Sequence, residues 1–164
     1  MTIRVLLIED DPGHVRAFRA AFDRARREGF DVVLDSVISF GGYLRAADRG
    51  YDAYILDDMI ADRCNAFEKI APLLASQFPG AAILHNSGNA DKDDILRQER
   101  RLNIKFARDA EGNAVACNKN PAIALEYIKD MLAEKGKRPR SLRPKARVSI
   151  APPQPRRRNS IPPQ

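Results

Sequence analysis

Short apolar runs alternate with amphipathic segments through the first 134 residues of the chain. Five such runs end at polar, turn-forming residues: 3–9, 30–35, 52–57, 81–86 and 114–118. Runs this short and this apolar are typical of strands buried on both faces of a sheet. The segments between and after them are predicted helices: 12–27, 40–49, 65–77, 90–102 and 121–134.

The strict alternation of strands and helices predicts an α/β fold with helices on both faces of a parallel sheet. Five strands favour a three-layer, doubly wound sheet with the flavodoxin-like strand order 2-1-3-4-5. In that order strands one and three are neighbours, so their carboxyl ends would bring together Glu9, Asp10 and Asp57. Ligands bind at this edge of open α/β sheets.

Local signals support the element boundaries. Asp11 is a suitable N-cap for a helix that begins at Pro12, and Gly29 is suited to end it. The segment 103–113 does not fit the alternation. Its Glu-Gly-Asn sequence favours a turn, and its flanks are predicted to pair as a small hairpin.

The polar residues at the strand ends suggest a chemistry. Asp10 and Asp57 supply carboxylates that suit Mg²⁺, with Glu9 able to help directly or through water. A carboxylate beside a cation can also attack phosphorus, and the transferred group then needs a cation and a hydroxyl around it. Lys119 and Ser87 would supply these. Asp58 is expected to point the other way, and His85 and His14 are expected to be a packed and a surface histidine.

These motifs resemble the receiver domain of two-component response regulators, over about residues 1–134. The resemblance rests on the first strand with its acidic pair, the third strand ending at Asp57, the Ser87-Gly88 pair and Lys119. It implies that Asp57 is the phosphoacceptor and that Ser87 and Lys119 hold the phosphoryl oxygens. It also implies that Mg²⁺ is bound by these groups: Glu9, Asp10, Asp57 and the backbone carbonyl of Met59.

The sequence departs from the receiver pattern in the segments around this site. The family's Met-Pro pair after the phosphoacceptor is replaced by Ile60-Ala61, and its loop glycine by Asn65. Asn120 separates the lysine from the proline that usually follows it, and Ala116 stands in place of the family's switch aromatic. We therefore expect a chemically complete site beside an unusual output face.

Charge and composition divide the chain at residue 135. Residues 135–164 contain ten Lys or Arg and no acid, and they hold seven of the eleven prolines. We expect this tail to be disordered, because it has too little apolar surface to offset its ordering entropy. Residues 1–134 hold 18 bases and 22 acids and are mildly acidic. Two cysteines without CxxC spacing, no signal-peptide pattern and no membrane-spanning run predict a cytoplasmic location.

Three functions remain open at this stage. The first is a single-domain receiver, not an enzyme, that takes its phosphoryl group from a histidine kinase or a histidine phosphotransfer protein and signals by protein contact. The second is a phosphorylation-independent receiver-like module anchored by its tail, which could contact an acidic partner, nucleic acid or an anionic membrane. No sequence-specific DNA binding is expected. The third, an aspartyl-phosphate hydrolase, would need an acid where Met59 stands.

Overall fold

The computed structural model describes residues 2–61, 63–88, 92–102, 104–109 and 111–137. Its central sheet has four parallel strands in the order β2-β1-β3-β6. Their bounds are Ile3–Ile8 for β1, Val32–Val37 for β2, Ala53–Leu56 for β3 and Ala82–His85 for β6. The predicted α/β fold and the order of its first four strands are confirmed, although the second strand lies two residues later than the predicted 30–35.

The fifth position of the sheet is occupied by an irregular edge instead of a regular strand. Ala116 forms a single parallel bridge with His85, whose N–H donates to the Val115 carbonyl at 3.2 Å. Two residues earlier along β6, the Ile83 carbonyl accepts from the Ala107 N–H at 2.7 Å. Two separate segments therefore share the edge where one strand, 114–118, was predicted.

The segment between these two edge contacts turns back on itself as predicted. Arg108 and Ala114 form an antiparallel bridge, and the N–H of Asp109 donates to the Asn113 carbonyl at 2.9 Å. This small hairpin takes the chain away from β6 at Ile83 and returns it two residues further along the same strand, at His85. The interruption explains why the edge does not form a continuous strand.

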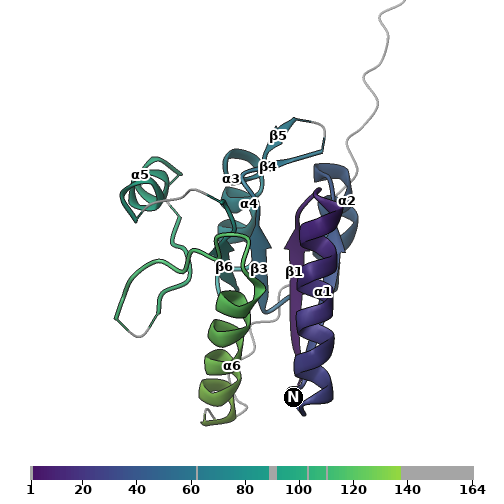
Figure 1. Cartoon of the computed structure of the whole chain (residues 1–164). Helices are drawn as coiled ribbons and strands as arrows, with labels where there is room; N and C mark the ends of the chain where they lie inside the picture. Colours follow the sequence, from purple (N-terminus) through teal and green to yellow (C-terminus); the bar gives the residue numbers. More distant parts are fainter. Residues whose placement is uncertain (1, 62, 89–91, 103, 110, 138–164) are drawn as a thin grey trace, which may run out of the picture.

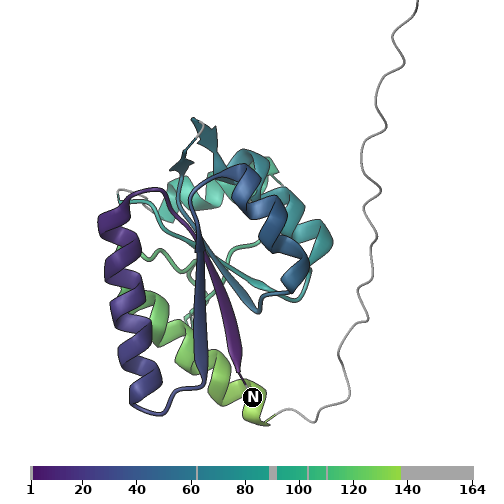
Figure 2. The same ribbon diagram turned by 90° about the vertical axis from the view of Figure 1, so that its right-hand side faces the viewer.

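Helices cover both faces of the sheet (Figures 1 and 2). One face carries α1 (Pro12–Arg27) and α6 (Pro121–Lys137), and the other carries α2 (Phe40–Ala46), α3 (Ala66–Lys69) and α4 (Ala71–Gln77). The helix α5 (Lys92–Leu102) lies at the edge of the sheet beside the hairpin. Among the described residues, no helix combines the length and the apolar character needed to cross a bilayer.

Three predicted helix boundaries need correction. The predicted helix 65–77 is divided at Ile70, because Pro72 has no N–H to continue the ladder. The predicted helix 40–49 ends in a 3₁₀ turn over Ala47–Arg49. The helix α6 continues to Lys137, past the boundary predicted at 134. The remainder of the predicted tail, 138–164, lies outside the described residues.

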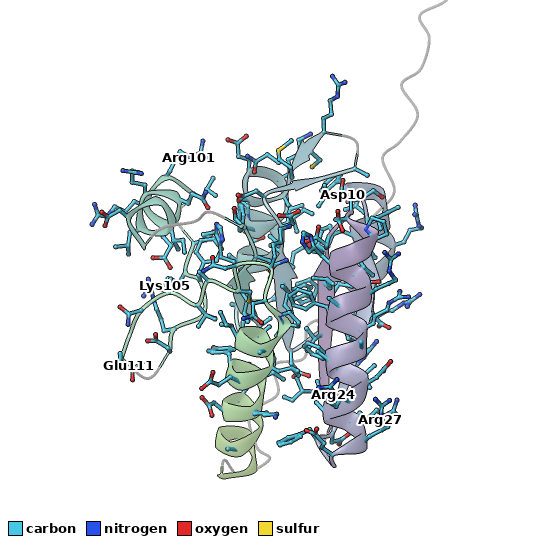
Figure 3. The ribbon with its side chains drawn as sticks, viewed as in Figure 1. Asp10, Arg24, Arg27, Arg101, Lys105 and Glu111 are labelled. Carbon is cyan, nitrogen blue, oxygen red and sulfur yellow. The ribbon has the colours of Figure 1, made fainter. Side chains whose placement is uncertain are left out.

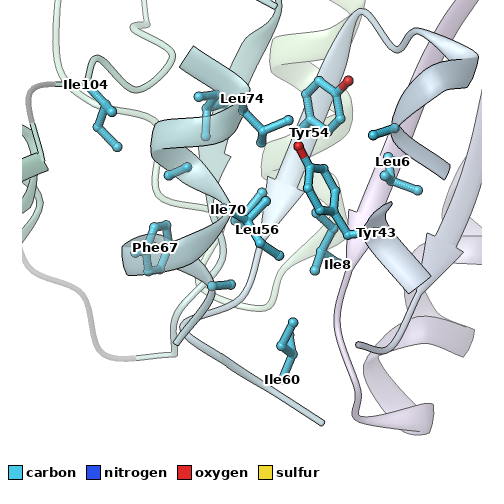
Figure 4. Packing of buried hydrophobic residues seen from close by; sticks show 14 of the residues in the cluster. Leu6, Ile8, Tyr43, Tyr54, Leu56, Ile60, Phe67, Ile70, Leu74 and Ile104 are labelled. Atoms are coloured by element: carbon cyan, nitrogen blue, oxygen red, sulfur yellow. The ribbon is translucent and has the colours of Figure 1, made fainter. Parts of the chain in front are cut away.

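The core has two parts, separated by the sheet. Alternate residues of β1 point to opposite faces. Leu6 and Ile8 join the cluster under α2, α3 and α4, which Figure 4 shows around Tyr43 and Tyr54. Leu7 joins the cluster under α1 and α6, which contains Phe18, Phe22, Ala124 and Ile128. The sheet is thus buried on both faces, as its apolar strands predicted.

A two-stranded antiparallel ribbon follows β3 directly and was not predicted. It consists of β4 (Met59–Ile60) and β5 (Cys64–Asn65). Ala61 bridges to Ser39, beyond the end of β2, and Asn65 caps α3 by accepting from the Glu68 N–H at 3.1 Å. The ribbon therefore fixes the chain that leaves the carboxyl end of β3.

Candidate functional site

The register of the sheet aligns the ends of three strands. In β1, β3 and β6 the last residues lie opposite one another: Ile8, Leu56 and His85. The backbone pairing continues one residue further, since Asp57 N–H donates to the Ile8 carbonyl at 3.0 Å and Asn86 N–H to the Leu56 carbonyl at 2.7 Å. The residues that come next are therefore neighbours at this edge: Glu9, Asp57 and Asn86.

Strand pleating decides which way these side chains point. Because alternate residues share a face, Glu9, Asp57 and Asn86 point toward the side covered by α1 and α6. Asp58 points to the opposite side, where its Oδ1 lies 3.6 Å from Nε2 of His85. The prediction that Asp58 faces away from its neighbour is confirmed.

Three carboxylates meet at this edge. Each of Glu9, Asp10 and Asp57 offers an oxygen, and the three oxygens lie within 4.8 Å of one another. Glu9 is fully buried and Asp57 is 7% exposed. Asp10 is exposed and lies at the end of β1 that faces the ribbon (Figure 3). Oxygen ligands of this kind, with one side open to water, suit Mg²⁺.

Lys119 joins the two buried acids. Its Nζ lies 2.6 Å from Glu9 Oε2 and 2.6 Å from Asp57 Oδ1. Burial lowers the pKa of this ammonium, but its hydrogen bonds to Asp57 and Glu9 outweigh the burial, so the pKa of Lys119 is raised overall. The lysine therefore stays charged beside the acids.

At Glu9, in contrast, the effect of burial on the pKa outweighs that of the hydrogen bonds. Burial raises the pKa of its carboxyl, the hydrogen bond from Lys119 lowers it, and the negative charge of Asp57 raises it again, with a net upward shift. The Asp11 N–H also donates to Glu9 Oε1, at 3.2 Å. The same Asp11 caps α1 as predicted, because its Oδ1 accepts from Gly13 and His14. One acidic segment thus begins the helix and supplies the site.

An unusual turn carries Lys119 to this position. Asn118 and Lys119 both have left-handed backbone geometry, with φ of 48° and 59°. Asn120 then places its Oδ1 3.0 Å from the Ala122 N–H at the start of α6. The additional residue before Pro121 is therefore the helix cap, and the two left-handed residues turn the lysine into the site.

Asn86 is a member of the site that the sequence analysis missed. It is fully buried, its Nδ2 donates to Glu9 Oε2 at 3.1 Å, and its Oδ1 accepts from the Lys119 N–H at 3.2 Å. An asparagine at a strand end is ordinarily interpreted as a turn residue. The useful signal was its position, one place before Ser87 and in register with the two acids.

Ser87 and Met59 lie beside the site, and their proposed roles remain predictions. Ser87 follows Asn86, and a Cβ on the next residue, Gly88, would lie 3.9 Å from Lys119 Cγ, so this turn adjoins the lysine. Met59 pairs with Asn65, and the neighbouring bond runs from Ala66 N–H to the Asp58 carbonyl. Because bonded pairs alternate in an antiparallel ladder, the Met59 carbonyl is left outside the ribbon's ladder.

The two histidines have different surroundings. His85 is fully buried, stacks on Phe67 at a centroid distance of 4.3 Å and meets Phe106 edge-on at 5.6 Å. This confirms the prediction of a packed histidine. His14 is partly exposed, as expected of a surface histidine, with Nδ1 3.6 Å from Glu9 Oε1. It borders the acids from the side of α1.

Neither a protein-family model nor a curated protein matches this sequence. Solved structures do match. A receiver domain protein from Methanospirillum hungatei has 17% identity and a TM-score of 0.59, over 84% of this chain and 98% of its own. The receiver domain of the stress response regulator RcsB from Escherichia coli has 15% identity and a TM-score of 0.58, over 83% and 95%. A signal receiver domain of an HD domain-containing protein from Pseudomonas fluorescens has 12% identity and a TM-score of 0.60, over 84% and 100%.

These likenesses concern the fold. The chain has the fold of response regulator receiver domains, and it places an acidic cluster and a lysine at the carboxyl edge of that fold's sheet. The class that the comparisons define is thus that of the receiver-domain fold, as the sequence motifs indicated.

Proposed function

We propose that this protein is a phosphorelay receiver that accepts a phosphoryl group on Asp57 from a phosphohistidine, with Mg²⁺ as cofactor. The observation that carries the proposal is the contact of Lys119 Nζ with Asp57 Oδ1 at 2.6 Å, inside a group of three carboxylates. A strand-end aspartate that only forms a turn needs neither a partly buried lysine nor two further acids. The phosphorylation-independent alternative is not favoured, because these groups come together.

The geometry suggests which atoms act. Asp57 Oδ1 already accepts from Lys119 Nζ and from the Asp58 N–H at 2.8 Å. Its Oδ2 is therefore the oxygen that would attack phosphorus, while the P–N bond to the donor imidazole breaks and the imidazole keeps the electron pair. Lys119 would donate hydrogen bonds to the phosphoryl oxygens as negative charge develops on them. Ser87 would donate a hydrogen bond from its hydroxyl to one of these oxygens.

The metal ligands would be Asp10, Asp57, the Met59 carbonyl and Glu9, directly or through water. When bound, Mg²⁺ would neutralise negative charge on the carboxylates and the phosphoryl oxygens. Glu9 has a second task, since both of its oxygens already accept hydrogen bonds from the chain. It orients Lys119 from within the core.

The partners that fit this chemistry are a histidine kinase or a histidine phosphotransfer protein, in the cytoplasm. A downstream protein would recognise the phosphorylated form by contact, because the added charge changes the surface around Ser87. The basic residues beyond 137 could add affinity for an acidic partner, nucleic acid or an anionic membrane through charge alone.

Acetyl phosphate with Mg²⁺ tests the proposal directly. Wild-type protein should gain one acid-stable, base-labile phosphoryl group by mass spectrometry, and Asp57→Asn should gain none. Asp58→Asn is the matched control, because that neighbouring acid points to the other side of the sheet. It should retain phosphorylation. Ser87→Ala should slow the reaction about tenfold, or about 1.4 kcal/mol in the barrier.

Two results would contradict the proposal. One is unchanged labelling of Asp57→Asn. The other is an unlabelled wild-type protein with acetyl phosphate and with a panel of phosphorylated histidine donors.

A further inference from the structure

We infer that Asn86 is a positioning residue that sets Lys119 against Asp57, an inference that rests on the proposed phosphoacceptor function. Its amide lies between two segments 110 residues apart in the chain, because Glu9 accepts from Nδ2 and Lys119 donates its backbone N–H to Oδ1. The side chain therefore contacts the lysine's acidic partner and the lysine's own backbone.

The hydrogen bonds fix the orientation of this amide. Only Nδ2 can donate to a carboxylate, and only Oδ1 can accept from an N–H, so a flipped amide would lose both bonds. Asn86 is fully buried, and its backbone N–H is held by the Leu56 carbonyl at the end of β3. The carboxamide is thus held in one orientation by the sheet, and it transmits that orientation to its two partners.

Lys119 needs such support. Its φ of 59° is left-handed, a geometry that a lysine rarely adopts without tertiary contacts. The bond from its N–H to Asn86 lies at this strained residue, and the bond from Nζ to Glu9 is fixed at the same carboxylate oxygen that Asn86 holds. Without Asn86, the turn would lose the hydrogen bond to the Lys119 N–H, and Glu9, which holds the ammonium, would lose its bond from the amide. Asp10 and Asp57 would keep their own contacts.

Two substitutions separate the contacts. Asn86→Ala removes both. Asn86→Asp keeps an acceptor for the Lys119 N–H but places a carboxylate oxygen against Glu9. The matched control is Asn113→Ala. This substitution removes an amide that donates to Asp109 in the hairpin and that contacts none of the three carboxylates of the site. All proteins are studied as the full chain with Mg²⁺ and acetyl phosphate.

For Asn86→Ala we expect the maximal phosphorylation rate to fall at least tenfold, while the Mg²⁺ concentration for half-maximal rate changes less than threefold. Hydrogen exchange of the Lys119 amide should become at least tenfold faster, with the amides of β1 unchanged. Asn86→Asp should lose rate but keep slow exchange at Lys119, and Asn113→Ala should match wild type.

Unchanged rate and unchanged Lys119 exchange in Asn86→Ala would overturn the inference. Faster exchange throughout β1 would also overturn it, because Asn86 would then only support the fold. If the wild type accepts no phosphoryl group, the proposed function fails, but the Lys119 exchange still decides whether Asn86 positions that turn.

Discussion

At the scale of single residues, the turn before α6 combines strain with a functional position. Asn118 has φ of 48° and lies next to Lys119, which has the same handedness. Asparagine tolerates this geometry better than other residues with a Cβ, because its short polar side chain can bond locally. An asparagine at position 118 therefore lowers the strain of the turn that places Lys119 in the site.

We predict that Asn118→Ala lowers the free energy of unfolding by about 1 kcal/mol, because alanine is disfavoured at positive φ. Asn118→Gly should change it by less than about 0.5 kcal/mol, since glycine adopts this geometry freely but gains entropy when unfolded. Urea unfolding of the two variants is the measurement. Equal loss in both would show that the asparagine side chain, and not the backbone geometry, matters here.

A second residue-scale feature is a buried hydroxyl. Tyr43 is 1% exposed, and its hydroxyl has no hydrogen-bond partner within the described part of the chain. Burial raises the pKa of Tyr43 from 10.0 to about 12. The folded state therefore holds this proton more tightly than the unfolded state does, so its contribution to stability is lost as the pH rises from about 10 to about 12.

For Tyr43→Phe we expect a free energy of unfolding at pH 7 that is unchanged or higher by up to about 1 kcal/mol, because an unpaired polar group leaves the core. Between pH 10 and 11.5, the variant should lose less stability than wild type. Urea midpoints across this range test both statements. Tyr54, which burial also shifts upward in pKa, remains in the variant and leaves part of the slope. An unchanged slope would contradict the assignment to Tyr43.

At the scale of elements, a single buried carboxylate joins α5 to the hairpin. Glu99 of α5 is 8% exposed, and it accepts from the Phe106 N–H at 2.8 Å and pairs with Arg108. Phe106 in turn meets the ring of His85 at the end of β6. These contacts fix the hairpin against the edge of the sheet where a regular strand is absent.

We predict that Glu99→Ala lowers the free energy of unfolding by about 3 kcal/mol, since it leaves a buried N–H without its acceptor and Arg108 without its partner. Glu99→Gln should cost less, because an amide oxygen can still accept from Phe106. Hydrogen exchange should accelerate over residues 104–109 and 114–117 first. Glu111→Ala, an exposed acid in the same hairpin, is the control and should behave as wild type (Figure 3). A loss confined to α1 would contradict this role.

The elements also show what the sequence could predict. The first four strands and their order followed from apolar runs between helices, because burial on both faces leaves a clear pattern. The fifth predicted strand lies at the expected edge beside β6, but it pairs there only through an isolated parallel bridge between His85 and Ala116. Its run at 114–118 is apolar because its side chains fill the cores, but its hydrogen bonds are interrupted by the hairpin, and periodicity does not report hydrogen bonding.

The site was predictable where its residues were distinctive. Carboxylates and a lysine at strand ends pointed to one edge, and the register places Glu9, Asp10, Asp57 and Lys119 together. Asn86 was missed because its role depends on a buried contact with Glu9, which only tertiary structure reveals. The β4–β5 ribbon was missed because two-residue strands are too short to show alternation.

At the scale of the whole molecule, the site lies where the segments leaving β1, β3 and β6 meet the turn before α6. Three acids and one lysine at this junction leave a net negative charge, so the carboxylates repel one another in the folded chain. A cation that binds only the folded arrangement would relieve that repulsion, so metal binding should stabilise the entire fold.

We predict that Mg²⁺ raises the free energy of unfolding by about 2.7 kcal/mol at a concentration of 100 times its dissociation constant, as mass action requires for one site. Urea unfolding in MgCl₂, compared with KCl of equal ionic strength, measures this difference. Asp10→Asn and Asp57→Asn should each lose most of the Mg²⁺ effect, and EDTA should reverse it in wild type. Asp58→Asn should keep the effect, because its side chain lies on the opposite face beside His85. Identical wild-type midpoints in the two salts would mean that these three carboxylates do not form a magnesium site.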